Sequence, residues 1–117
     1  MVNANIGALA LAPQNMVVPQ INGGTLGFTL TTGSTQILNQ NTQAQKVTFH
    51  NPGTVSVFVC QATDLNGNAL TPGALPGNWQ IFPGGLLIVT GNGVGSAWLG
   101  AAETETNPIT IAVSQTL

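Results

Sequence analysis

The chain has 117 residues, enough for one domain with a modest hydrophobic core. Hydrophobic residues make up 43% of it, but charged residues only 3%, against roughly a quarter in ordinary soluble domains. One lysine and three acidic residues form no basic patch, which argues against nucleic acid as a direct partner. So little charge also does little to keep copies apart in solution, and this favours a place in an assembly.

Residues 1–20 show no strong period, and Pro13 and Pro19 interrupt any helix that begins there. We predict an extended N-terminal arm over 1–20 and a β-sandwich domain over 21–117. The arm is either a frayed terminus or a segment that lies on a neighbouring subunit. Its apolar content favours the neighbouring subunit, because solvated tails are usually polar. The arm residues expected at an interface are Ile6, Leu9, Leu11, Met16, Val17 and Val18, the last three as a possible edge strand.

Two strands are predicted after the turn signal at residues 22–24. Residues 25–32 alternate, with Leu26, Phe28 and Leu30 on one face, as expected of a half-buried strand. Residues 34–38 follow as a short second strand.

Residues 46–61 predict an antiparallel β-hairpin around which the rest of the chain is arranged. Val47 and Phe49 share a face of its first strand, and the second strand carries valines at 55, 57 and 59. Because a slip of one residue would turn an apolar set outward, we expect an odd number of loop residues, which places the valines beside Val47 and Phe49. Phe58 then lies on the second face, which is either covered or part of a contact surface.

The rest of the chain continues in short strands. A long loop over 62–77 precedes a strand at 78–82, and a tight turn at 83–85 leads into the apolar run 86–89, expected to be buried on both faces. Strands at 96–101 and 109–113 complete the chain. About eight short strands without a helical period predict an all-β fold, an antiparallel sandwich or barrel.

Few side chains are available for chemistry. His50 and Cys60 suggest a nucleophile and its base, but in the predicted hairpin they lie about 13–20 Å apart along the strands. Cys60 is interpreted as a small hydrophobe on a strand. Asp64 begins a faint likeness to a calcium loop that lacks its glycine and its final glutamate, so this stretch is interpreted as a turn. Glu103 and Glu105 are interpreted as a solvated loop. We predict no catalytic, metal or cofactor site, and no enzymatic activity.

Three motifs point to a family. The strand-turn-strand VTFHNPGTVSVFV at 47–59 is followed by a loop rich in glycine and proline, by the turn IFPGG at 81–85, and by the ending ITIAV at 109–113. From residue 45 onward this order resembles the small capsid decoration, or cement, proteins of tailed bacteriophages. Members tend to carry an arginine or another charge before the first of these strands, where this chain has only Lys46.

The resemblance implies a jelly-roll-like β-sandwich that coats and stabilises the phage capsid as a structural virion protein. It implies self-association, as a dimer or trimer, and contacts to the major capsid protein. It places the protein on the capsid surface after synthesis in the host cytoplasm, without cofactor. A membrane is not expected, because no apolar run approaches the roughly 20 residues of a span. Phe58 joins the arm residues as a candidate interface residue.

A carbohydrate-binding β-sandwich module of a phage fibre or host-attachment protein is the alternative. It requires that Trp79 or Trp98 be exposed as a stacking platform, whereas aromatic residues on alternating strands are more often part of the core.

Overall fold

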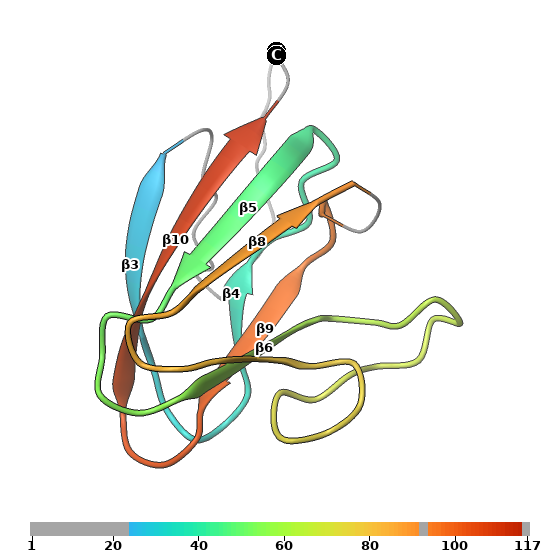
Figure 1. Cartoon of the computed structure of the whole chain (residues 1–117). Helices are drawn as coiled ribbons and strands as arrows, with labels where there is room; N and C mark the ends of the chain where they lie inside the picture. Colours follow the sequence, from blue (N-terminus) through green and yellow to red (C-terminus); the bar gives the residue numbers. More distant parts are fainter. Residues whose placement is uncertain (1–23, 92–93, 116–117) are drawn as a thin grey trace, which may run out of the picture.

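The computed structural model describes residues 24–91 and 94–115, and every regular element in these ranges is a β-strand. Two antiparallel sheets of four strands each form a β-sandwich (Figure 1), which confirms the predicted all-β class. The first sheet has the order β3-β10-β5-β8, and the second sheet has the order β4-β9-β6-β7. The strands are β3 (Thr25–Leu30), β4 (Thr35–Leu38), β5 (Ala44–His50), β6 (Val57–Gln61), β7 (Trp79–Ile81), β8 (Leu86–Thr90), β9 (Trp98–Ala102) and β10 (Asn107–Gln115).

The strand pairs are nested along the chain. The first described strand pairs with the last, β3 with β10, and the series continues inward with β4·β9, β5·β8 and β6·β7, always antiparallel. Two more ladders, β10·β5 and β6·β9, complete the sheets. The described chain is therefore one long antiparallel ribbon, folded back between β6 and β7 and wound into two layers.

The core lies between the sheets and consists of alternate residues of the strands. Val47 and Phe49 of β5 lie beside Val113 and Ile111 of β10, and all four side chains are buried. Trp98 of β9 meets them from the second sheet, with its ring centroid 5.0 Å from that of Phe49. The predicted inward faces of these strands are confirmed.

The predicted hairpin over 46–61 is wrong, because β5 and β6 belong to different sheets and do not pair. The segment between them crosses from one sheet to the other. Val57 and Val59 therefore face Val47 and Phe49 across the core instead of lying beside them in one sheet. Alternation identifies the buried side chains of a strand, but it does not distinguish a partner in the same sheet from a partner in the opposite sheet.

Asn51 holds this crossing in place. Its completely buried side chain donates hydrogen bonds to the carbonyl oxygens of Val55 (2.8 Å) and Ile81 (2.9 Å). Its backbone N–H donates to the carbonyl oxygen of Gly85 (3.0 Å), in the turn before β8. Its Oδ1 accepts a hydrogen bond from Nδ2 of Asn107, at the start of β10 (2.7 Å). One amide side chain thus ties the crossing to both sheets.

The predicted burial of residues 86–89 on both faces is also wrong. β8 lies at the edge of the first sheet, where Leu86 and Ile88 are 63% and 58% exposed. Leu87 and Val89 point the other way and pack against the core. An apolar run is compatible with an apolar outer face as well as with double burial, and the sequence does not say which strand lies at an edge.

β6, which lies between β9 and β7, is buried on both faces. Phe58 and Cys60 on its outer side are 7% and 0% exposed, as buried as the valines on its inner side. The second face of this strand is therefore covered by other parts of the described chain.

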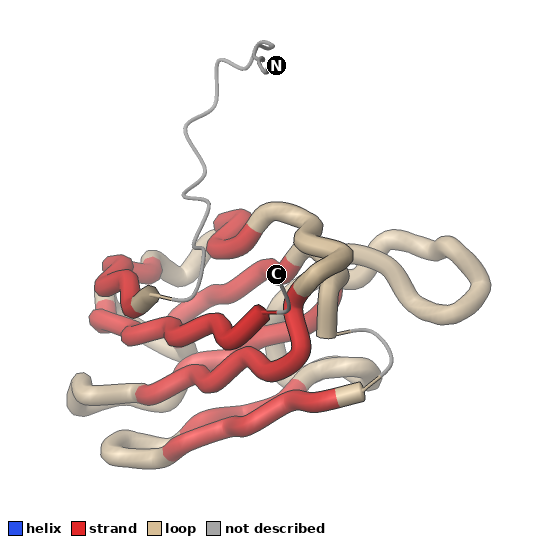
Figure 2. Tube along the Cα trace, turned by 90° about the horizontal axis from the view of Figure 1, so that it is seen from above, coloured by secondary structure: helices blue, strands red, loops and turns tan. Residues whose placement is uncertain are grey.

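The long loop and the tight turn predicted on either side of β7 are present. Residues 62–78 connect β6 to β7, and part of this loop projects from the sandwich (Figure 2). In the turn before β8, the Gly85 N–H donates to the Phe82 carbonyl oxygen (2.8 Å), and Gly84 has a φ of 79°. Proline at 83 followed by a glycine with positive φ is typical of a type II turn.

The predicted arm over 1–20, and with it the domain boundary at residue 21, lies outside the described residues. In the described part of the chain, no helix is long and apolar enough to cross a membrane.

Candidate functional site

The two side chains weighed as a nucleophile and its base lie on opposite outer faces of the sandwich. His50 alternates with the inward-facing Phe49 and so lies on the outer side of the first sheet. Cys60 alternates with Val59 and lies on the outer side of the second sheet. Packed sheets are about 10 Å apart, so the imidazole and the thiol of one chain do not meet. The hairpin from which their separation was predicted is wrong, and the two side chains are kept apart by the two layers of the sandwich instead.

The Cys60 thiol is enclosed by the protein. Its side chain is fully buried, and burial raises the pKa of the thiol because the thiolate is disfavoured away from water. A thiol that stays neutral is a weak nucleophile. This environment fits the interpretation of Cys60 as a small hydrophobe.

Asp64 closes a tight turn in the long loop. Its Oδ1 accepts hydrogen bonds from the backbone N–H groups of Asn66 (2.8 Å) and Asn68 (2.9 Å). The hydrogen bond from the Asn68 backbone is the main cause that lowers the pKa of the Asp64 carboxyl. The stretch is therefore a turn, as predicted. Glu103 and Glu105 are exposed, and no group of three or more potential metal ligands occurs among the described residues.

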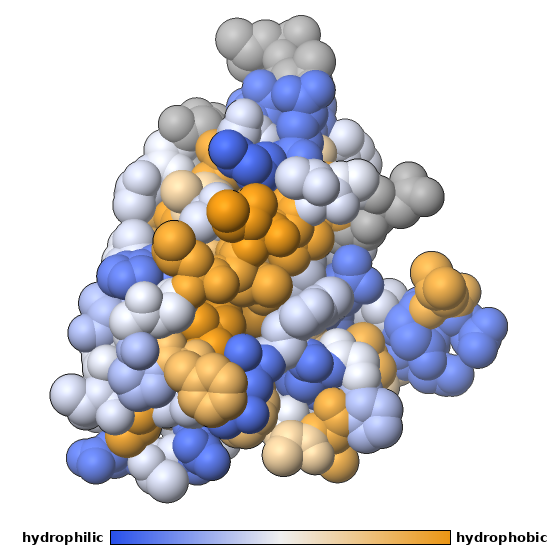
Figure 3. Space-filling model, viewed as in Figure 1, coloured by the Kyte–Doolittle hydropathy of each residue, from blue (hydrophilic) through white to orange (hydrophobic). Residues whose placement is uncertain are grey.

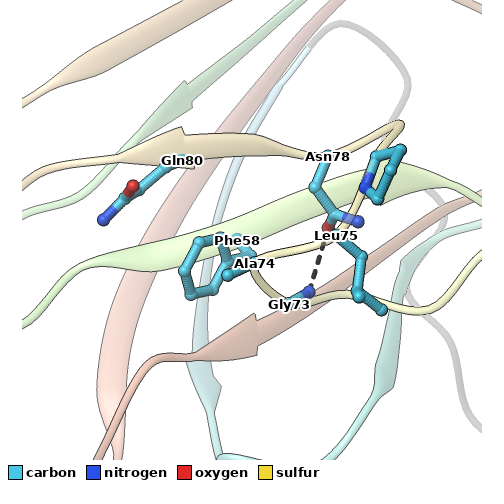
Figure 4. Close-up of a pocket in the computed structure, with 7 residues that line it drawn as sticks. Phe58, Gly73, Ala74, Leu75, Asn78 and Gln80 are labelled. Atoms are coloured by element: carbon cyan, nitrogen blue, oxygen red, sulfur yellow. Dashed lines mark hydrogen bonds between the residues drawn. The ribbon is translucent and has the colours of Figure 1, made fainter.

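A shallow pocket of about 230 Å³ lies where the long loop folds over the outer side of β6 (Figure 4). The Phe58 ring lies beside Ala74, with Gln80 of β7 on its other side. Asn78 shapes the loop, since its Oδ1 accepts a hydrogen bond from the Gly73 N–H (3.1 Å) and its Nδ2 donates to the Thr71 carbonyl oxygen (2.9 Å). The lining has no titratable side chain, and the pocket is smaller than most small-molecule sites. This loop is the cover that buries Phe58.

The two tryptophans have different environments. Trp98 is fully buried and belongs to the core. Trp79 lies on the edge strand β7, is 39% exposed, and has its ring centroid 5.5 Å from that of Trp98. Of the two tryptophans, only Trp79 offers part of its indole to solvent.

The most distinctive surface feature is an apolar patch on and beside β8. Phe82, Leu86 and Ile88, here called the β8 patch, are each more than half exposed. Apolar atoms gather over β8 in Figure 3. Leu86 lies opposite His50 of the neighbouring strand β5, and Ile88 lies opposite Thr48 of that strand. The strands of this sheet contain no carboxylate side chain, and Lys46 is their one lysine.

The candidate interface residues named from the sequence do not coincide with this patch. Ile6, Leu9, Leu11, Met16, Val17 and Val18 lie outside the described residues, and their role stays a prediction. Phe58 is 7% exposed beneath its loop, and its place in an interface also stays a prediction. The β8 patch was missed because its apolar run was assigned to the interior. The unbroken Leu-Leu-Ile-Val after the Pro-Gly-Gly turn does not distinguish an edge strand from a buried one, because the apolar run of β6 is covered.

Comparison of the chain with protein-family models, with curated proteins and with solved structures gives no match.

Proposed function

We propose that the protein is a non-enzymatic structural protein of a tailed-phage virion, a decoration or cement protein that coats the assembled capsid. The observation that carries the proposal is the surface of the first sheet, which combines an exposed apolar patch with almost no charge. Large exposed apolar patches are typical of surfaces that other proteins cover. The motifs at 47–59, 81–85 and 109–113 add the resemblance to this family.

The strand connectivity supports the finer assignment of the sandwich as a jelly roll. A jelly roll is an eight-stranded double sheet of two Greek keys, a fold that occurs in viral capsid proteins and lectins. Winding a long antiparallel ribbon into two layers produces it, and the nested pairs from β3·β10 to β6·β7 follow that scheme. Fold alone does not define function, so this argument concerns architecture only.

The proposed mechanism is burial of neutral and apolar surface across several subunits. The protein self-associates as a dimer or trimer and bridges subunits of the major capsid protein on the capsid surface. A ligand that binds only the assembled shell stabilises that shell by mass action. Neither nucleic acid nor a membrane takes part in this mechanism.

Co-sedimentation tests the proposal. Shells assembled from the major capsid protein of the same virus are mixed with the purified protein, and unassembled capsid protein serves as the control. We expect the protein to pellet with shells in a fixed ratio to the capsid protein and not to bind unassembled subunits. We also expect it to raise the temperature at which the shells dissociate. Absence from the pellet at micromolar concentrations of both components would refute the capsid role.

Deletion of residues 1–20 tests the arm separately. We expect loss of attachment or of oligomer formation with an unchanged circular dichroism spectrum, because strands β3 to β10 all lie beyond the deletion. Unchanged attachment together with an unchanged oligomer would contradict a role for the arm.

The partial exposure of Trp79 favours one alternative, a carbohydrate-binding module of a fibre or host-attachment protein. An indole at a rim can stack on a sugar ring. A glycan screen monitored by tryptophan fluorescence tests this alternative. It requires a sugar that shifts the emission of the native protein and has no effect on a Trp79→Leu variant.

A further inference from the structure

β8 is an edge strand without the usual protection of an edge. It pairs with β5 on one side and with no described strand on the other. Its five residues include no charge and no proline, and Leu86 and Ile88 are exposed. Exposed edges of this kind pair readily with another strand, and proteins usually blunt them with charges, prolines or bulges. The composition of β8 is that of a strand covered on both sides.

The other three edges of the sandwich differ from β8. β7 has three residues and β4 has four, and Ile37 and Leu38 of β4 are buried. β3 presents Thr25, Gly27 and Thr29 outward, which offers little apolar surface. Among the edges that the structure describes, β8 alone therefore combines an unpaired side with large exposed aliphatic side chains.

The chain itself contains a segment that suits this edge. The 23 residues before the described part contain no charged residue. Within them, five residues, QNMVV at 14–18, lie between Pro13 and Pro19, and β8 also has five residues. In an extended conformation Met16 and Val18 share one face and Val17 lies on the other. Both surfaces are neutral, so no like charges oppose their contact.

We propose that residues 14–18 of a neighbouring copy pair with β8 as an additional strand of the first sheet. Main-chain hydrogen bonds to the free edge supply affinity, and the apolar side chains on both strands supply packing, as in strand addition generally. The inference rests on the self-association part of the proposed function and names the surface that carries it.

The reach of the chain favours a neighbouring copy over the same copy. Thr25, Ala112, Thr48 and Ile88 lie in one row across the first sheet, so a strand added beyond β8 is four spacings, about 19 Å, from Thr25. The Val113 N–H donates to the Gly24 carbonyl oxygen (3.2 Å), which fixes residue 24 beside β10. The six residue steps from 18 to 24 span at most about 20–22 Å. A segment of the same chain would cross the sheet face fully taut, whereas a segment from another copy has no such limit.

Crosslinking between two labelled populations tests the contact directly. One full-length protein carries Val17→Cys and the other carries Ile88→Cys, both in a Cys60→Ala background. Mixing them with a short bismaleimide, which tolerates an uncertain register, is expected to yield a covalent dimer. Thr29→Cys, an exposed site on the opposite edge strand, replaces Ile88→Cys in the control and is expected to yield none. Equal yields from the two pairs would overturn the proposal.

Native mass provides the second measurement. Light scattering of the full-length protein is expected to give a multiple of 11.9 kDa. Ile88→Lys, which places a charge on the free edge, and Val17→Pro, which removes a backbone donor from the added strand, are both expected to reduce it to that of a monomer. Thr29→Lys is the matched control for charge and exposure and is expected to leave the mass unchanged. Circular dichroism verifies that all variants are folded.

Each contrary outcome has a defined meaning. A monomeric wild type, or an oligomer that survives Ile88→Lys, overturns the proposal. An oligomer lost in Ile88→Lys but kept in Val17→Pro also overturns it and indicates direct pairing of two β8 strands. Crosslinking within a single chain that carries both cysteines, without crosslinking in the mixture, assigns the segment to its own copy. Shell binding is measured separately, so failure of the capsid role is distinct from failure of this contact.

Discussion

At the scale of single residues, the hydrogen-bonded side-chain amides of Asn51 and Asn107 connect the two sheets. Asn107 is 1% exposed, and its Oδ1 accepts hydrogen bonds from the N–H groups of Thr54 (3.1 Å) and Val55 (3.2 Å). Its Nδ2 donates to Asn51, so the amide links the start of β10 to the crossing between the sheets. Gly53 leaves room for it, because a Cβ at that position would overlap the carboxamide.

We therefore predict that Asn107→Ala lowers the free energy of unfolding by roughly 2–4 kcal/mol, because two backbone donors lose their acceptor in a largely buried site. Urea denaturation followed by circular dichroism measures the change. Thr106→Ala, at the exposed neighbouring position, is the control and should change stability by less than about 0.5 kcal/mol. A loss below about 1 kcal/mol for Asn107→Ala would show that water replaces the amide at little cost.

The Asp64 carboxylate gives the molecule a local response to acid. Backbone hydrogen bonds to the ionised form hold the pKa of Asp64 below its ordinary value of 3.8. The carboxylate therefore supports its turn fully above the unfolded-state pKa, and this support is lost as the pH falls through the lower, folded-state pKa.

We expect NMR titration of the Asp64 carboxyl carbon to place its midpoint below 3.8, with the amide resonances of Asn66 and Asn68 moving in the same step. In Asp64→Asn those amide movements should disappear from the acid range. A midpoint at or above 3.8 would contradict the observed hydrogen bonding.

At the scale of strands, alternation in the sequence located most of the elements. The described strands lie close to their predicted ranges, and the inward residues of β5 and β10 follow directly from period-two patterning. Turn chemistry was equally informative where one turn type fits, as at Pro83 and Gly84.

Which strands pair with each other could not be predicted from the local sequence pattern. β5 and β6 are separated by a short segment that contains Pro52 and Gly53, which resembles a hairpin turn. The side chain of Asn51 makes the difference, because its bonds to Val55 and Ile81 stabilise a crossing between the sheets. Such bonds join residues up to 56 positions apart, as between Asn51 and Asn107, and no local window contains them.

Edge position was also not predictable, and the candidate interface was missed for that reason. The runs in β6 and β8 are both strongly apolar, yet one is covered on both sides and the other is not. The cover over β6 comes from the long loop around residues 73–78, whose path depends on the whole fold. No loop among the described residues covers Leu86 and Ile88 in the same way, and both side chains are exposed.

At the scale of the whole molecule, the scarcity of charge determines how the protein responds to its solvent. One lysine limits the number of lysine–carboxylate pairs to one, and an exposed pair of this kind contributes about 0–1 kcal/mol. Stability must come mainly from apolar burial and from hydrogen bonds, which monovalent salt screens little. The proposed contact at β8 is neutral on both sides, so screening should not weaken it either.

Raising NaCl from low to moderate concentration shortens the Debye length from about 30 Å to below about 10 Å. We predict that this change shifts the melting temperature by no more than about 2 °C. The native mass at constant protein concentration should also stay the same, because no ion pair is expected in the contact. A Thr29→Glu variant provides a charged comparison on the same sheet.

A melting shift above about 5 °C would indicate a specific ion site or an electrostatic network, and dissociation by salt would indicate a charged interface elsewhere on the molecule. Constancy of both quantities would support an assembly held together by uncharged surface, from the core of each sandwich to the contacts between copies.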